Sequence, residues 1–116
     1  MAKLEAALKG SFDNILARLD VGVLDASMSA SYEDGSDWHC GDVRCAVRVY
    51  ERYSAVGSNR VSMSLTLVGK ENDLFLTAIT SGGSQAMFFK VNTWGEEAFL
   101  DTLSQVVEQI REEGMA

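Results

Sequence analysis

The side chains best suited to chemistry lie in one short stretch, SDWHCGDVRC, at residues 36–45. The stretch holds both cysteines, the one histidine and one of the two tryptophans. Zinc takes four ligands from cysteine, histidine and carboxylate groups, usually in paired spacings such as C-x2-C. On a straight strand His39 and Cys40 point to opposite faces, so one metal ion could not easily bind both. No further cysteine or histidine exists to complete a closed site, and we assign no metal and no cofactor.

The thiols allow two other chemistries. A disulfide between Cys40 and Cys45 is geometrically conceivable, but in a reducing compartment it would act only as a redox switch. A nucleophile–base pair of Cys40 and His39 is disfavoured, because adjacent residues seldom face each other and catalysis needs hydrogen-bond contact. We therefore assign no catalytic residue. A small metal- or thiol-dependent enzyme that uses His39, Cys40 and Cys45 is the alternative interpretation.

A structural interpretation explains the same stretch more simply. Trp38 and Cys40 share one parity, whereas Val43 and Cys45 share the other. A bulge at Gly41–Asp42 would insert one residue and switch the face, so that both sets point inward. The stretch is then a twisted strand that enters a sheet, with buried and unreactive cysteines.

Length and charge limit the classes of function. The 116 residues fit a single domain spanning 1–116. A net charge of -7 argues against nucleic-acid partners, which need a basic surface, and against anionic membrane surfaces. No apolar run approaches the roughly 18 residues of a membrane span, and the first ten residues lack the apolar segment of a secretory signal. With only two cysteines, we predict a cytoplasmic protein.

An apolar stripe at spacings of four and three predicts a first helix over residues 2–19. Its members are Leu4, Leu8, Phe12, Ile15 and Leu19. Gly10 costs about 1 kcal/mol relative to alanine inside a helix, which allows a break there. The stripe continues in phase beyond Gly10, and this favours one helix.

Five later stretches alternate between apolar and polar residues, or are apolar throughout, as is typical of β-strands. They are residues 24–32, 43–52, 61–67, 74–80 and 86–91. The turns expected between them are EDGS (33–36), 55–59, 69–73 and 81–85. A second helix is expected to open at NTWGEEAF, where Thr93 and Glu96 fit a capping box. Its buried stripe is Phe99, Leu103, Val106 and Ile110, and Gly114 marks its end.

The order helix, strands, helix predicts an α+β fold. Short connections imply antiparallel neighbours, so we expect a β-meander of four to five strands. The N-terminal and the C-terminal helix need an apolar surface, and both should pack on one face of the sheet.

The opposite face of this sheet is the first candidate site. We expect it to carry Arg44, Arg48 and Tyr50, with Phe75 and Ile79 as an apolar patch at one side. Apolar patches of this kind tend to mark interfaces. A second copy of the chain explains the patch most simply, because two-fold dimers dominate soluble oligomers.

One rim of the sheet is the second candidate site. Strand parity places residues 33–42, the turn at 69–73 and the start of the second helix at one end. Trp38, His39 and Trp94 would cluster there near helix amides, which attract anions, and could bind a small anionic ligand. A carrier with a ligand between helices and sheet is a further option. Dense packing of Met28, Met63, Leu65 and Phe99 would leave such a carrier no cavity.

The stretch SGGSQAMFFKVNTWGEEAFL, together with the order of elements, resembles a family of small uncharacterised bacterial proteins over nearly the whole chain. The resemblance implies a bacterial cytosolic domain and transfers no catalytic residue. The order is also similar to that of small acidic secretion chaperones, α+β dimers that bind partner proteins, but this chain lacks their helix in mid-sheet. We expect a non-enzymatic interaction or ligand-binding domain that acts as a homodimer.

Overall fold

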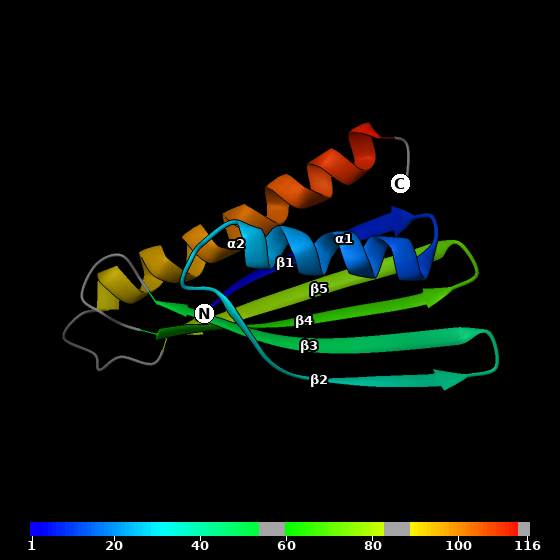
Figure 1. Ribbon diagram of the computed structural model, residues 1–116, viewed down its shortest axis with the longest axis horizontal. Coiled ribbons are helices and arrows are strands. Elements are labelled where there is room, and N and C mark those ends of the chain that lie inside the picture. The colour runs from blue at the N-terminus through cyan, green and yellow to red at the C-terminus, as the bar shows by residue number, and fades with distance from the viewer. Residues whose placement is uncertain (54–59, 83–88, 114–116) are drawn as a thin grey trace.

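The computed structural model describes residues 1–53, 60–82 and 89–113, and the side chains of the last range from residue 96 onward. Five strands and two helices follow one another in these ranges (Figure 1). They are β1 (Ala2–Lys9), α1 (Phe12–Asp25), β2 (Ser31–Cys40), β3 (Val43–Tyr53), β4 (Arg60–Lys70), β5 (Asp73–Gly82) and α2 (Phe89–Glu112).

The strands form one antiparallel sheet in the order β1-β5-β4-β3-β2. Strands β2 to β5 form an antiparallel meander, as predicted for the class of fold, and β1 joins it beside β5. Both helices lie on one face of this sheet, α2 over β1, β5 and β4, and α1 beside α2 towards β3 (Figure 1). The α+β class, the antiparallel meander and the shared face of the two helices are thus confirmed.

The first predicted helix is wrong in its first half, because residues 2–9 are strand β1. Leu4 and Leu8 are four residues apart, a spacing that fits one face of a helix and one face of a strand equally well. Gly10 ends the strand with a φ of 142°, which only glycine adopts readily, and its amide donates to the Asn72 carbonyl at 3.0 Å. Ser11 then caps α1 by accepting a hydrogen bond from the amide of Asn14.

The predicted strand over residues 24–32 is also wrong. Helix α1 continues to Asp25, residues 26–30 connect the helix to the next strand, and β2 begins only at Ser31. Met28 is fully exposed in this connection and takes no part in the core, whereas Met63, Leu65 and Phe99 are buried there.

The predicted hairpin at EDGS is wrong, because those residues lie inside β2. The turn instead falls on Gly41–Asp42, where Gly41 has a φ of 59°. A turn at this point replaces the predicted bulge, and the register shift of this strand pair lies between Tyr32 and Asp34. The turns at 55–59 and 81–85 lie wholly or mostly outside the described residues.

Strands β3, β4 and β5 agree with the predicted strands, but the last predicted strand is wrong where it is described, since residues 89–91 belong to α2. Thr93 is therefore inside the helix and does not cap it. Glu96 has another role. Its carboxylate accepts a hydrogen bond from the amide of Gly82 at 2.7 Å and forms an ion pair with the N-terminal ammonium at 2.8 Å. Residues 86–88 and Gly114 lie outside the described residues.

The core fills the layer between helices and sheet. Its fully buried side chains include Ile15, Leu19 and Val23 of α1, Met63, Leu65 and Leu67 of β4, and Phe99, Leu103 and Ile110 of α2. The two helices approach closely at Gly22, where an added Cβ would overlap Val106. The layer is closed over β1, β5 and β4, whereas no residue of β2 is buried.

Candidate functional site

Strand β3 turns a different row of side chains towards the helices than the sequence predicts. The Arg44 guanidinium lies 2.8 Å from the Asp13 carboxylate of α1 and 4.2 Å from the centre of the Phe12 ring. Tyr50 is fully buried and donates its hydroxyl to Asp20 of α1 at 2.6 Å. The prediction that Arg44, Arg48 and Tyr50 share the uncovered face with Phe75 is therefore wrong. They lie on the helix-covered face.

The uncovered side of the sheet, which we name the open face, carries the alternate rows. Trp38 pairs with Cys45 and Cys40 with Val43, so these four side chains share it. Phe75 and Ile79 lie on it as predicted, and both are about two-fifths exposed. The central residues of the open face are Trp38, Cys40, Val43, Cys45, Val47, Val49, Ser62, Ser64, Thr66, Val68, Phe75, Thr77 and Ile79.

None of these central residues is charged, and the charged groups stand at the margins. Lys3 and Glu5 on β1 pair with each other at 3.8 Å, and Lys9 pairs with Asp73 at 3.3 Å. At the opposite end, Glu51 is hydrogen-bonded to Ser62 and paired with Arg60. The open face is thus an uncharged, largely apolar centre with a polar rim.

The reactive stretch is divided between the two faces. Cys40 is exposed and Cys45 half-buried on the open face, and both thiols are free. His39 pairs with Arg44 and so lies on the other side of the strand. Within residues 1–53, 60–82 and 89–113, no three histidine, cysteine or carboxylate side chains gather as metal ligands. The alternative metal site therefore has no ligand set in this part of the chain.

The predicted rim site is not brought together. Trp38 and His39 lie near the β2–β3 turn, at the same end of the sheet as the β4–β5 turn. Trp94 lies in the first turns of α2, and Glu96 just beyond it contacts Gly82 at the far end of β5. Figure 1 shows the start of α2 at the opposite end of the molecule from the β2–β3 turn. The predicted strand over residues 86–91 would have led the chain back to the β4–β5 turn before the helix. Residues 89–91 belong to α2 instead, so the helix begins at the end of the sheet where β5 stops.

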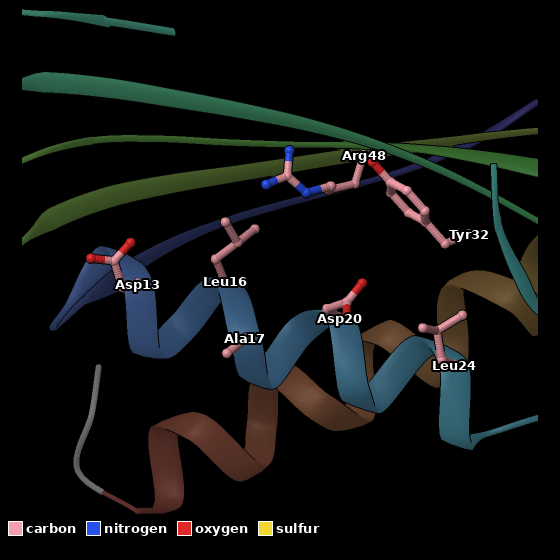
Figure 2. A pocket seen from close by; sticks show the side chains of 7 residues that line it. All are labelled: Asp13, Leu16, Ala17, Asp20, Leu24, Tyr32 and Arg48. Carbon is pink, nitrogen blue, oxygen red and sulfur yellow. The ribbon is translucent and has the colours of Figure 1, made fainter. Parts of the chain in front are cut away.

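A second surface feature is a groove between α1 and the strands β2 and β3, on the helix-covered face (Figure 2). It has a volume of about 500 Å³. Its lining comes from one side of α1 and from two strand residues: Asp13, Leu16, Ala17, Asp20, Leu24, Tyr32 and Arg48. The groove exists because α1 lies above β3, so that the same face of β2 has no helix over it.

Hydrogen bonds fix the polar groups of this groove. Two causes raise the pKa of Tyr50: mainly its burial, and in addition its hydrogen bond to Asp20. The hydroxyl therefore stays protonated and remains a donor. Arg48 turns towards β2, where it donates to the Asp37 carboxylate at 2.9 Å and to the Ser36 carbonyl, and it also donates to the carbonyl of Val47 on its own strand. The Tyr32 ring packs edge-on against Tyr50 with ring centres 5.9 Å apart.

The sequence prediction missed this groove because it assigned residues 24–32 to a strand. The signal is nevertheless present, since Leu16, Asp20 and Leu24 follow at intervals of four. That spacing gives a stripe along one helix face, next to the buried stripe of α1.

No helix of the described ranges combines the length and apolarity that crossing a membrane requires. Comparison with curated proteins found no match. Residues 1–111 match a sequence family described as a family of unknown function, DUF6054. The resemblance to an uncharacterised family is thereby confirmed, and the chain belongs to the DUF6054 family.

Proposed function

We propose that this chain is a non-enzymatic interaction domain that forms a homodimer through its open face. The observation that carries the proposal is an uncovered sheet face whose centre has no charged residue and, apart from the serines and threonines of β4 and β5, is apolar. Large exposed apolar patches mark association sites in soluble proteins. Trp38 is 61% exposed there, and Phe75 and Ile79 extend the same patch across β5.

The size of the open face fits a stable dimer. Five strands about 4.8 Å apart, each about ten residues long at roughly 3.3 Å per residue, present roughly 800 Å². A standard interface buries about the same area on each partner. Sheets pack face to face in this way in β-sandwiches, with the strands of the two sheets aligned within about 30° or crossing near 90°.

The charge distribution favours a second copy as the occupant. The chain has a net charge of -7, so two copies repel each other unless their charges stay apart. On the open face the charged groups are confined to the rim, and interface centres are depleted in charge in the same way. Two copies meeting through this face would therefore bury valine, phenylalanine and tryptophan, with Asp34 on the edge strand β2 at the rim.

The free thiols favour a reducing compartment for this dimer. Cys40 is exposed and unpaired, and Cys45 is unpaired beside it on the open face. Exposed thiols of this kind persist in the cytosol and are oxidised in secretory compartments. We therefore place the dimer in the cytoplasm.

Charge insertion at the centre of the open face tests the proposal. Sedimentation velocity at 1 to about 100 µM should give a dimer for the wild-type chain. Val47→Lys and Phe75→Glu should each weaken the dimer at least about 100-fold, because a charge would be buried without a partner. The matched control is Val21→Lys, which adds the same charge at an exposed apolar site on α1. That variant should remain dimeric.

Two results would overturn the proposal. One is a wild-type chain that stays monomeric over the whole concentration range. The other is a Val47→Lys variant that keeps its native circular dichroism spectrum and dimerises as tightly as Val21→Lys.

A further inference from the structure

We propose that the groove between α1 and β2 binds a small organic cation, an ammonium group carried on an apolar body. The groove lies on the helix-covered side of the sheet, so it is separate from the open face and stays accessible in the proposed dimer. Its volume of about 500 Å³ falls within the range of small-molecule sites, which runs from about 300 to 1,000 Å³.

The charge of the groove comes from one carboxylate. Arg44 is paired with Asp13 at 2.8 Å, and Arg48 is paired with Asp37 at 2.9 Å. Asp20 has no cationic partner among the described residues, and it accepts a hydrogen bond from the neutral hydroxyl of Tyr50. The groove therefore has one negative charge that no neighbouring cation balances.

Asp20 is also placed and oriented for a ligand. The hydroxyl of the fully buried Tyr50 holds one carboxylate oxygen at 2.6 Å. Figure 2 shows Asp20 between Leu16 and Leu24 on one wall, with Tyr32 on the strand side. A fixed anion therefore stands between two leucines, on a wall whose other acid, Asp13, is paired with Arg44.

Apart from Asp13 and Arg48, which are held in ion pairs, the remaining lining suits the apolar body of such a ligand and its positive charge. Leu16 and Leu24 are partly buried against the core, and Ala17 leaves room between the turns of α1. Tyr32 is half exposed, so its ring is available to a cation as well as to an apolar group. The acidic surface of the whole chain would also attract a cation and repel an anion.

Matched probes separate this proposal from general apolar binding. Tryptamine and indole-3-propionate share one aromatic body and carry opposite charges at neutral pH. The shifts of backbone amide resonances in α1 and β2 should follow tryptamine and give an affinity at least tenfold above that for indole-3-propionate. Asp20→Asn should weaken tryptamine binding at least tenfold and remove the preference, since it keeps an acceptor for Tyr50 and deletes the charge.

A second pair of variants guards against loss of folding. Ala17→Lys places a cation at an exposed position of the groove wall and should abolish tryptamine binding. Val21→Lys adds the same charge to the same helix outside the groove lining, and Glu112→Gln removes an acid at the end of α2. Both should leave the affinity within about twofold of wild type.

Binding of the two probes with equal affinity would overturn the proposal, as would a native Asp20→Asn variant that binds tryptamine like wild type. Absence of any shift in α1 and β2 at 10 mM tryptamine would also overturn it. None of these outcomes depends on the oligomeric state.

Discussion

The two faces of the central strands differ in how they are covered and in what they contain. On β4 the helix-covered row is Val61, Met63, Leu65 and Leu67, all fully buried. The side chains that the same strand turns to the open face are small and mostly polar: Ser62, Ser64, Thr66 and Val68. On β3 the relation is reversed, since valines occupy the open face while arginines and a tyrosine face α1.

This reversal shows that apolar character alone does not decide which row is buried. Helix α1 carries acids on the side that faces β3, and long polar side chains reach them: Arg44 reaches Asp13 and Tyr50 reaches Asp20. Arg52 of the same row lies with its guanidinium 4.7 Å from the centre of the Phe99 ring. The covered layer thus uses hydrogen bonds and aromatic contacts on β3, and the valines of this strand lie on the open face.

The largest expected effect is a difference in unfolding free energy between substitutions on the two faces. Leu65→Ala should lower the free energy of unfolding by about 2–5 kcal/mol, because it leaves a cavity in a fully buried layer. Val49→Ala on the half-buried open face should cost about 1 kcal/mol in the monomer. Urea unfolding at a concentration below that of dimerisation measures both. Equal losses would show that the two faces are buried alike.

A smaller effect is expected from the polar contact of the covered face. Tyr50→Phe removes a hydrogen bond to a carboxylate and should cost about 1.5–3 kcal/mol at pH 7. Burial raises the pKa of Tyr50, whereas a tyrosine in the unfolded chain ionises near pH 10. The stabilisation is therefore complete below about pH 10 and declines as the pH rises above it.

The measurement for this prediction is urea unfolding of both proteins from pH 7 to 11. The difference between wild type and Tyr50→Phe should shrink above about pH 10. Tyr53→Phe, at an exposed position, is the control and should change little at any pH. A difference that is independent of pH would contradict the buried, hydrogen-bonded state of Tyr50.

The smallest expected effect concerns the turn that determines which face Trp38 and Cys40 occupy. Gly41 has a φ of 59° and no atom would contact its added Cβ, so Gly41→Ala changes only backbone strain. The loss should be about 1–2 kcal/mol. Glu71 has a φ of 56° in the neighbouring β4–β5 turn, and Glu71→Gly should leave stability unchanged or raise it. Thermal unfolding of the two variants tests the pair, and a stabilising Gly41→Ala would contradict the left-handed turn.

The sequence was most informative where a single period admits one interpretation. Strand β4 alternates clearly, β5 is an apolar run between two predicted turns, and α2 repeats Phe99, Leu103, Val106 and Ile110 at spacings of three and four. Residues 2–9 were ambiguous, because Leu4 and Leu8 satisfy both periods. Gly10 was the one sign of a break in this stretch, because glycine readily adopts the positive φ that ends a regular element.

Strand β2 could not be derived from local pattern. None of its residues is buried, so no apolar period exists, and its Asp34–Gly35 pair is typical of a turn. It is a strand because its backbone pairs with β3, an interaction between distant residues. The candidate sites depend on this strand: its true register sends Trp38 to the open face, and its lack of cover creates the groove beside Asp20.

The rate at which Cys40 is alkylated, measured against protein concentration, tests the central claim most directly. Cys40 is exposed on the open face of one chain, and a second copy on that face would cover it. Iodoacetamide labelling, read by mass spectrometry of the peptides on either side of Arg44, reports each thiol separately. The account predicts that Cys40 labelling slows as the concentration rises, and that Phe75→Glu removes this dependence. A labelling rate that stays constant from 1 to about 100 µM would contradict it.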